Sequence, residues 1–212
     1  MTSATGRRSS AAAQLARAGF TDPDRALRHL GDAALADVVH ARTGFHATSE
    51  AFTDATADLV AALGRTADPD AALLGVVRWV EALAVGVDRD TDPGRVQSVA
   101  AALNLLRGGD LPDVVGTRAR LFAVLGGSSA LTDHLVRHPR HWTVFASASA
   151  PDPAELRAEL LAAVGADGGA GVPIATTGRA GRSPGDALRV AYRRRLVGLA
   201  GRDLSSPEPA AV

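Results

Sequence analysis

The amino-acid sequence predicts an all-α protein, an irregular bundle of several helices, and three observations support this fold class. Leu, Val and Ala supply most of the apolar side chains, aromatic residues make up only 4%, and Leu and Ala favour helices. Asp-Pro and Ser-Pro pairs, which are typical of helix starts, recur along the chain. Apolar residues after these pairs repeat at helical spacing, and no stretch shows the sustained alternation of a strand.

The Asp-Pro and Ser-Pro pairs predict where individual helices begin. An N-cap oxygen accepts a hydrogen bond from a first-turn amide, and the Pro that follows has no N–H to leave unpaired. Glu155 and Asp186 stand three residues after two of these caps, which approximates a capping box. The predicted N-caps are Asp22, Asp68, Asp92, Asp152 and Ser183.

Each predicted helix carries an apolar face. The apolar residues follow the three-and-four spacing that places side chains on one side of a helix. The faces are Leu27, Leu30, Ala34 and Val38; Phe52, Leu59, Val60 and Leu63; Leu73, Val76, Val77, Val80, Leu83, Ala84 and Val87; Val96, Val99, Ala100, Leu103 and Leu106; and Leu188, Tyr192, Leu196 and Leu199.

The glycine pair at 126–127 predicts a corner between two helices, the second of them capped by Ser128 or Ser129. Trp142, which follows a helix-ending proline, is expected to pack over this corner, and His134 is expected to hydrogen-bond across it. Leucines on the two helices are expected to meet there, each contributing ~1.5–3 kcal/mol if fully buried. They are Leu121, Leu125, Leu131 and Leu135.

Glycine, proline and small polar residues divide the chain into segments. The pair Gly108-Gly109 ends one helix, and a long stretch rich in Gly, Thr and Pro carries too few apolar residues to pack. The expected segments are a disordered N-terminus at 1–10, a helical bundle at 11–164, a flexible loop at 165–183, an Arg-rich helix at 184–204 and a tail at 205–212.

Composition argues against several classes of protein. The formal net charge is zero, so no overall field favours nucleic acid or an anionic membrane. Cysteine is absent, which excludes disulfides, thiolate nucleophiles and Cys-ligated zinc. No apolar run approaches the ~20 residues that span a bilayer. We therefore expect a cytoplasmic protein that binds neither nucleic acid nor membrane.

Three aspartates resemble the start of a calcium-binding loop. Asp88, Asp90 and Asp92 occupy the spacing of its first three ligand positions. The turn glycine is replaced by Pro93, and the bidentate glutamate is replaced by Val99. An acidic loop that ends in a helix cap explains these residues better than a calcium site does.

Histidines form the only cluster of residue types suited to a metal. His134 and His138 are four residues apart and share a helix face, with His141 and Asp133 nearby in the sequence. The zincin pattern requires Glu directly after the first His, where this chain has Leu135. The preferred interpretation is a helix C-terminus where imidazoles interact with free carbonyls.

Other patterns give weaker indications of chemistry. The Gly-rich run at 165–171 follows no strand, and the chain has no Lys for a phosphate-binding Walker motif. Three consecutive arginines, Arg193 to Arg195, spread over roughly 200° of a helix, which predicts a solvated edge rather than a docking face. The serines Ser128 and Ser129 lack the setting of a hydrolase nucleophile.

Four segments resemble one enzyme family. Residues 118–142 are similar to a stretch in which an Arg-Leu helix leads to Leu-Gly, a Ser pair, Asp-His-Leu, His-Pro and Trp. Residues 188–204 resemble the Arg-rich helix that follows, and 18–23 and 67–73 resemble earlier helices. The chain thereby resembles the N-terminal helical part of actinobacterial-type bifunctional glutamine synthetase adenylyltransferase/adenylyl-removing enzymes, a fragment that precedes the first nucleotidyltransferase domain.

The resemblance implies an activity that this chain would not carry alone. Members of the family move AMP onto and off a tyrosine of glutamine synthetase, using ATP and Mg²⁺, and a PII-type regulatory protein is an implied partner. Their Asp-x-Asp motif holds the metal and lies beyond the position that matches Asp203-Leu204. The pair in Asp88-Arg89-Asp90 is flanked by helices rather than set on an apolar strand. We therefore expect no catalytic, cofactor-binding or metal-binding residue in this chain, and no activity of the fragment alone.

Two alternatives remain open from the sequence. One is a non-enzymatic helical interaction module with a concave face, and the other is a histidine-based metal protein. The Arg-rich helix carries Gly198 and Gly201, each costing about 1 kcal/mol relative to Ala. Those glycines predict a weak helix, or one that becomes firm only against an absent domain.

Overall fold

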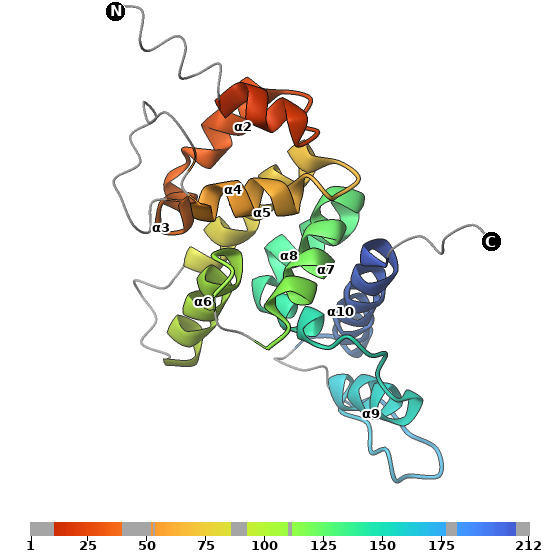
Figure 1. Cartoon of the computed structure of the whole chain (residues 1–212). Coiled ribbons are helices and arrows are strands. Elements are labelled where there is room, and N and C mark those ends of the chain that lie inside the picture. The colour runs from red at the N-terminus through yellow and green to blue at the C-terminus, as the bar shows by residue number, and fades with distance from the viewer. Residues whose placement is uncertain are drawn as a thin grey trace, which may run out of the picture.

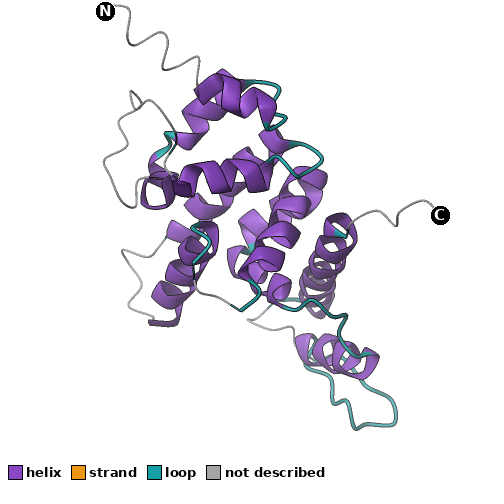
Figure 2. Cartoon of the chain, in the orientation of Figure 1, coloured by secondary structure: helices purple, strands orange, loops and turns teal. Residues whose placement is uncertain are grey.

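Helices α5 (Pro69–Ala84) and α7 (Val114–Gly127) pack against each other at the centre of the molecule (Figure 1). The structure is a computed structural model that describes residues 11–39, 52, 54–85, 93–109, 112–176 and 182–206. Every regular element within these ranges is a helix (Figure 2), which confirms the all-α prediction.

The other helices surround the central pair. Residues 11–17 are helical and precede α2. At the opposite end, α10 lies along α7, and α9 projects from the bundle beside α10 (Figure 1). The elements are α2 (Pro23–Leu30), η1 (Ala33–Leu35), α3 (Ala36–Val39), α4 (Asp54–Leu63), α6 (Pro93–Leu106), α8 (Ser129–Arg137), η3 (Pro139–Ala146), α9 (Pro153–Ala163) and α10 (Pro184–Ser205), where η denotes a 3₁₀ helix.

The predicted N-caps are confirmed wherever the structure describes them. Asp22 and Asp68 each accept a hydrogen bond of 2.9 Å from the amide of the third residue of their helix. Asp152 accepts from the amide of Ala154 at 2.6 Å. Ser183 accepts from the Asp186 amide at 3.2 Å, and its hydroxyl donates to the Asp186 carboxylate at 2.7 Å. Helix α6 begins at Pro93 as predicted, but Asp92 lies outside the described residues.

The glycine-marked boundaries also appear, with one cap that the sequence analysis missed. Gly108 adopts a positive φ of 70° just after α6. Asp113 caps α7 from the left-handed region, with φ of 49°, and its carboxylate accepts from the amide of Gly116 at 3.2 Å. At the next corner Ser128 is the cap, and it ends α7 and starts α8 without any intervening residue.

The corner between α7 and α8 packs largely as predicted. Leu121, Leu125 and Leu135 are buried there, whereas Leu131 is only half-buried. Trp142 of η3 is buried and meets Trp79 edge to face, with ring centroids 6.3 Å apart. The tryptophans therefore join α5 to η3 beneath the corner.

The predicted apolar faces are correct for some helices and rotated for others. All four residues of the face that includes Phe52 are buried, and so are most of those on α5, although Ala84 is exposed and Val87 lies outside the described residues. On α6 the predicted face is correct only in part, because Leu106 is buried and Val99 and Leu103 are half-buried against the core. Val96 of the predicted face is 50% exposed, whereas Ala102 and Leu105, which lie outside that face, are fully buried. Short helices of Ala, Leu and Val offer two candidate faces, and the packing against neighbours selects one.

The glycines of α10 have a packing role that the sequence did not predict. Gly201 is buried against Phe145, and a Cβ added there would lie 2.7 Å from that ring. Gly198 lies against Val144, and a Cβ added at Gly198 would lie 3.4 Å from the Cβ of Val144. The glycines thus let η3 approach α10 closely.

The segment after α9 forms a loop whose two ends are joined. Thr176 donates its amide to the Val164 carbonyl at 3.1 Å and its hydroxyl to the Gly165 carbonyl at 2.7 Å. Residues 177–181 of the predicted loop, the predicted disordered N-terminus at 1–10 and residues 207–212 of the predicted tail lie outside the described residues. The tail was predicted to begin at 205, but Ser205 is the last residue of α10 and Ser206 is its C-cap. Among the described helices, none has the length and apolar character needed to cross a lipid bilayer.

Candidate functional site

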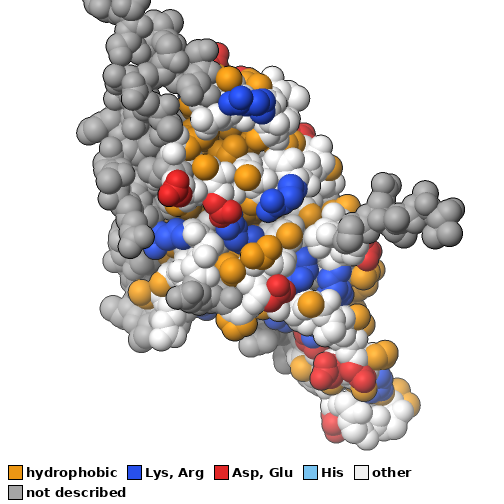
Figure 3. Space-filling model, in the orientation of Figure 1, with side chains coloured by type: hydrophobic (Ala, Val, Ile, Leu, Met, Phe, Trp, Pro, Cys, Tyr) orange, Lys and Arg blue, Asp and Glu red, His pale blue; other side chains and the backbone are white. Residues whose placement is uncertain are grey.

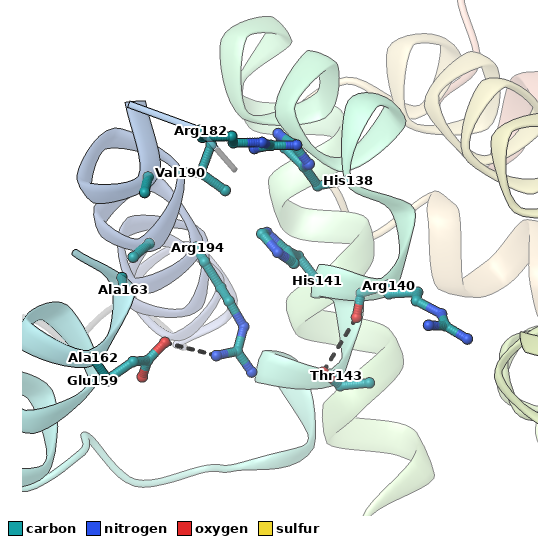
Figure 4. A pocket seen from close by; sticks show the side chains of 12 residues that line it. His138, Arg140, His141, Thr143, Glu159, Ala162, Ala163, Arg182, Val190 and Arg194 are labelled. Carbon is teal, nitrogen blue, oxygen red and sulfur yellow. Dashed lines mark hydrogen bonds and ion pairs between the residues drawn. The ribbon is translucent and has the colours of Figure 1, made fainter. Parts of the chain in front are cut away.

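A cavity of about 500 Å³ opens where the end of α8, η3, α9 and the start of α10 meet (Figure 4). One wall consists of imidazole and guanidinium groups, and the opposite side consists of small apolar residues. Its lining residues are His138, Arg140, His141, Thr143, Glu159, Ala162, Ala163, Arg182, Ala187, Val190, Ala191 and Arg194.

The three histidines of the sequence cluster do come together. The ring centroids of His134 and His138 are 4.9 Å apart, and each lies 5.1 Å from the ring of His141. Nε2 of His134 and Nδ1 of His141 share a hydrogen bond of 3.0 Å, which joins α8 to η3 and does not cross the corner between α7 and α8 as expected. The predicted interaction of the imidazoles with free carbonyls is not what this geometry shows, since the rings contact one another.

The environment of the imidazoles favours their neutral form. Burial lowers the pKa of His141 to about 3, and the neighbouring histidines and Arg194 act in the same direction. Burial also lowers the pKa of His134 to about 4, and the neighbouring His138 contributes the next largest decrease. The pKa of His138 falls through burial and through Arg182. At neutral pH the wall therefore holds uncharged rings surrounded by fixed positive charge.

Asp133, the carboxylate closest to these histidines in sequence, belongs to a different contact. It accepts a hydrogen bond from Arg78 of α5 at 2.7 Å, and this bond lowers the pKa of the carboxyl. Among the residues that the structure describes, no group of three His, Asp or Glu side chains is arranged to hold a metal ion. The sequence cluster of potential ligands is thus divided between a histidine contact and an ion pair.

The arginines of α10 correct the predicted solvated edge. Arg193 is exposed, but Arg194 and Arg195 are half-buried and both contact Glu159 of α9. The Arg194–Glu159 distance is 2.7 Å. Figure 4 shows Arg194 and Glu159 facing each other across the junction of α9 and α10. Two arginines and one carboxylate hold the projecting helix α9 to the bundle and leave an excess of positive charge.

Several residues of this cavity gave no signal in the sequence. Arg182 falls at the end of the Gly-rich loop, and Glu159 reads as an ordinary residue of a charged helix. They meet the histidines because α10 returns beside η3. No local pattern predicts that return.

The remaining candidate motifs that the structure describes do not line the cavity. Asp88, Asp90 and Asp92 lie outside the described residues. The Gly-rich run at 165–171 follows α9, a helix, and Ser128 serves as a helix cap.

An apolar stripe on α10 faces outward rather than into the bundle. The four residues that the sequence grouped as its apolar face remain substantially exposed, at 42% for Leu188, 59% for Tyr192, 37% for Leu196 and 46% for Leu199. The buried side of α10 instead carries Ala187, Val197, Gly198 and Gly201. Figure 3 shows apolar and arginine side chains next to each other on the surface in this region.

Comparison with known proteins identifies relatives along most of the chain. It is 38% identical over 204 residues, 95% of its length, to the bifunctional glutamine synthetase adenylyltransferase/adenylyl-removing enzyme of Streptomyces avermitilis. It is 36% identical to the protein of the same name in Streptomyces coelicolor over 94% of its length, and 39% identical to that of Mycobacterium avium over 70%. The chain spans only 16%, 15% and 12% of these relatives. No protein-family model matches the chain, and no solved structure matches it.

Proposed function

We propose that this chain, which belongs to the family of bifunctional glutamine synthetase adenylyltransferase/adenylyl-removing enzymes, forms the N-terminal helical part of such an enzyme. The observation that carries the proposal is the 38% identity over 95% of the chain to a relative of which it spans 16%. The complete enzyme would add AMP to glutamine synthetase and remove it again. Regulation by a PII-type protein belongs to the same proposal, and the use of ATP fits a cytoplasmic location.

The role proposed for this segment is structural support. The described residues do not fit Mg²⁺, because no group of three potential ligands is arranged to hold a metal ion. Mg²⁺ and ATP would therefore be bound by the nucleotidyltransferase domains of the longer protein, and the fragment alone would be inactive.

The exposed stripe of α10 provides the surface for this support. Leu188, Tyr192, Leu196 and Leu199 follow at intervals of four, four and three residues, which places them within an arc of about 80° on the helix. An apolar stripe of this length is usually covered by another element. We assign the covering element to the remainder of the same polypeptide, since the relatives extend far beyond the region that this chain spans.

Enzyme assays with adenylylated and unmodified glutamine synthetase test the proposal. The 212-residue chain should neither release AMP nor transfer it, whereas a longer form of the gene product should do both. AMP release by the purified 212-residue chain would refute the support role. The coding sequence would also have to continue into the family's Asp-x-Asp motif.

A non-enzymatic interaction module is the second candidate, and the same exposed stripe on α10 favours it. In that case the coding sequence would lack the Asp-x-Asp motif, and the stripe would be covered by a separate protein. Substituting Tyr192→Ser and Leu196→Ser together separates the candidates. A support helix would lose AMP transfer in the longer form, whereas a module would lose only capture of its partner.

A further inference from the structure

The cavity beside α9 combines an excess of positive charge with hydrogen-bond donors from several elements. We propose that it binds the phosphate group of a small metabolite, held between Arg182 and the imidazoles of His138 and His141. The proposal concerns a site within this chain and does not depend on AMP transfer.

The first argument is charge. Among the described residues that line the cavity, Glu159 is the only acidic one, and Arg182 and Arg194 direct their guanidinium groups toward the cavity (Figure 4). Glu159 already contacts both Arg194 and Arg195, so the contact between α9 and α10 retains net positive charge. An incoming phosphate would supply the negative charge that this wall lacks.

The second argument is geometry. Figure 4 shows Arg182 beside His138 at one end, His141 projecting from η3 toward α10, and Arg194 below it. The donors thus come from the end of α8, from η3 and from the segment before α10, which surround one space. A guanidinium fork fits phosphate oxygens in a bidentate manner, and a neutral imidazole can donate one N–H.

The third argument concerns the histidines themselves. His141 uses Nδ1 to bond with His134, which fixes the orientation of its ring and leaves Nε2 for a ligand. The rings of His138 and His141 stack at an interplanar angle of 21°, so both present an edge in the same region. Arg182 and Arg194 disfavour protonation of these imidazoles. A bound anion would offset that repulsion and favour the protonated form, in which each ring donates two N–H groups.

The size and the opposite wall of the cavity suit a small metabolite rather than a macromolecule. About 500 Å³ lies within the usual range for small-molecule sites. The wall formed by Ala162, Ala163, Ala187 and Val190 would contact an apolar or ring portion of the ligand. The shared chemistry is a phosphate group, whose source is either free phosphate or a phosphomonoester.

Isothermal titration calorimetry of the 212-residue chain with inorganic phosphate and with AMP tests this site. Sodium chloride at matched ionic strength and acetate serve as the non-phosphate controls. Saturable binding of phosphate or AMP, without binding of acetate, is the expected result. Tighter binding of AMP would identify a phosphomonoester, and equal affinities would identify free phosphate. Absence of binding by both phosphate probes would overturn the proposal.

Paired substitutions locate the binding. Arg182→Ala should weaken phosphate binding about tenfold or more, since a charged hydrogen bond is lost. His138→Gln should weaken it by a smaller factor, and the exposed Arg157→Ala on α9, outside the cavity lining, should change it less than about twofold. Equal weakening by Arg182→Ala and Arg157→Ala would show binding by surface charge alone and reject the site. Thermal unfolding of each variant confirms that its fold is intact.

Discussion

The indole N–H of Trp79 donates to the carbonyl of Pro139 at 2.9 Å, which ties the middle of α5 to the first residue of η3. Trp142 lies beside it, but its own buried indole N–H finds no hydrogen-bond partner among the described residues. Trp79 thus joins α5 to η3 by a hydrogen bond, whereas Trp142 contributes by packing alone.

Trp79→Phe should destabilise the protein by about 1–3 kcal/mol, because it removes the indole bond and leaves the Pro139 carbonyl without its partner. The measurement is the free energy of unfolding in urea. Trp142→Phe is the matched control, since it removes an equal volume and an N–H without a partner in the described part of the chain. A larger loss in Trp142→Phe than in Trp79→Phe would contradict this assignment.

Gly201→Ala should destabilise the protein by about 1–3 kcal/mol, although alanine favours helices by about 1 kcal/mol. The added Cβ would lie 2.7 Å from the Phe145 ring, within a crowded contact of α10 and η3. Gly185→Ala, with nothing within 4 Å of its added Cβ, should instead leave stability unchanged or raise it. The melting temperature should therefore fall for Gly201→Ala but not for Gly185→Ala, and equal shifts would argue against close packing at Gly201.

Glu159→Gln should loosen α9 from the bundle, because Arg194 and Arg195 both lose the carboxylate that they share. We expect a loss of about 1–3 kcal/mol and faster hydrogen exchange of the α9 amides. Arg189→Ala breaks an exposed ion pair with Asp186 and should change stability by only about 0.5 kcal/mol or less. Unchanged exchange in α9 would indicate that Glu159 does not hold this helix.

Stability should fall as the pH is lowered from 7 to 5. The pKa of His134 is lowered to about 4 and that of His141 to about 3, whereas both protonate near 6.5 in the unfolded chain. The unfolded chain therefore binds more protons between these values, so the stability present above pH 6.5 is lost as the pH decreases. After allowance for solvent screening we expect a loss of about 2 kcal/mol in urea unfolding.

His141→Gln provides the control for this pH dependence. It removes one of the two strongly shifted imidazoles, so the decrease in stability between pH 7 and pH 5 should be smaller than in the unaltered chain. The lowered pKa of the Asp113 carboxyl, caused first by its hydrogen bond to Arg120, affects stability only nearer pH 4 and below. An identical slope in His141→Gln would show that the histidine contact does not determine the acid sensitivity.

The sequence predicted local features well because they depend on neighbouring residues. The caps at Asp22, Asp68, Asp152 and Ser183 need only a side-chain oxygen and the amides that follow it. The proximity of His134 and His138 follows from helical spacing in the same way.

What depends on tertiary contacts was predicted less well. Helical periodicity alone predicts that the side of α10 with the larger apolar side chains is buried. In the structure the side with Gly201 meets η3, so Leu188 and Tyr192 face outward. The cavity was missed for the same reason, since Arg182 and Glu159 approach the histidines only when α9 and α10 are in place.

The double use of Ser128 makes the corner between α7 and α8 sensitive to length. Its amide donates to Val124 at 3.0 Å and its hydroxyl accepts from Leu131 at 3.4 Å, so no spare residue separates the two helices. A single inserted residue would rotate α8 by about 100° about its axis and carry His134 away from His141. Insertions that a surface loop would absorb should therefore be intolerable here, whereas changes of side chain at exposed positions nearby should have little effect.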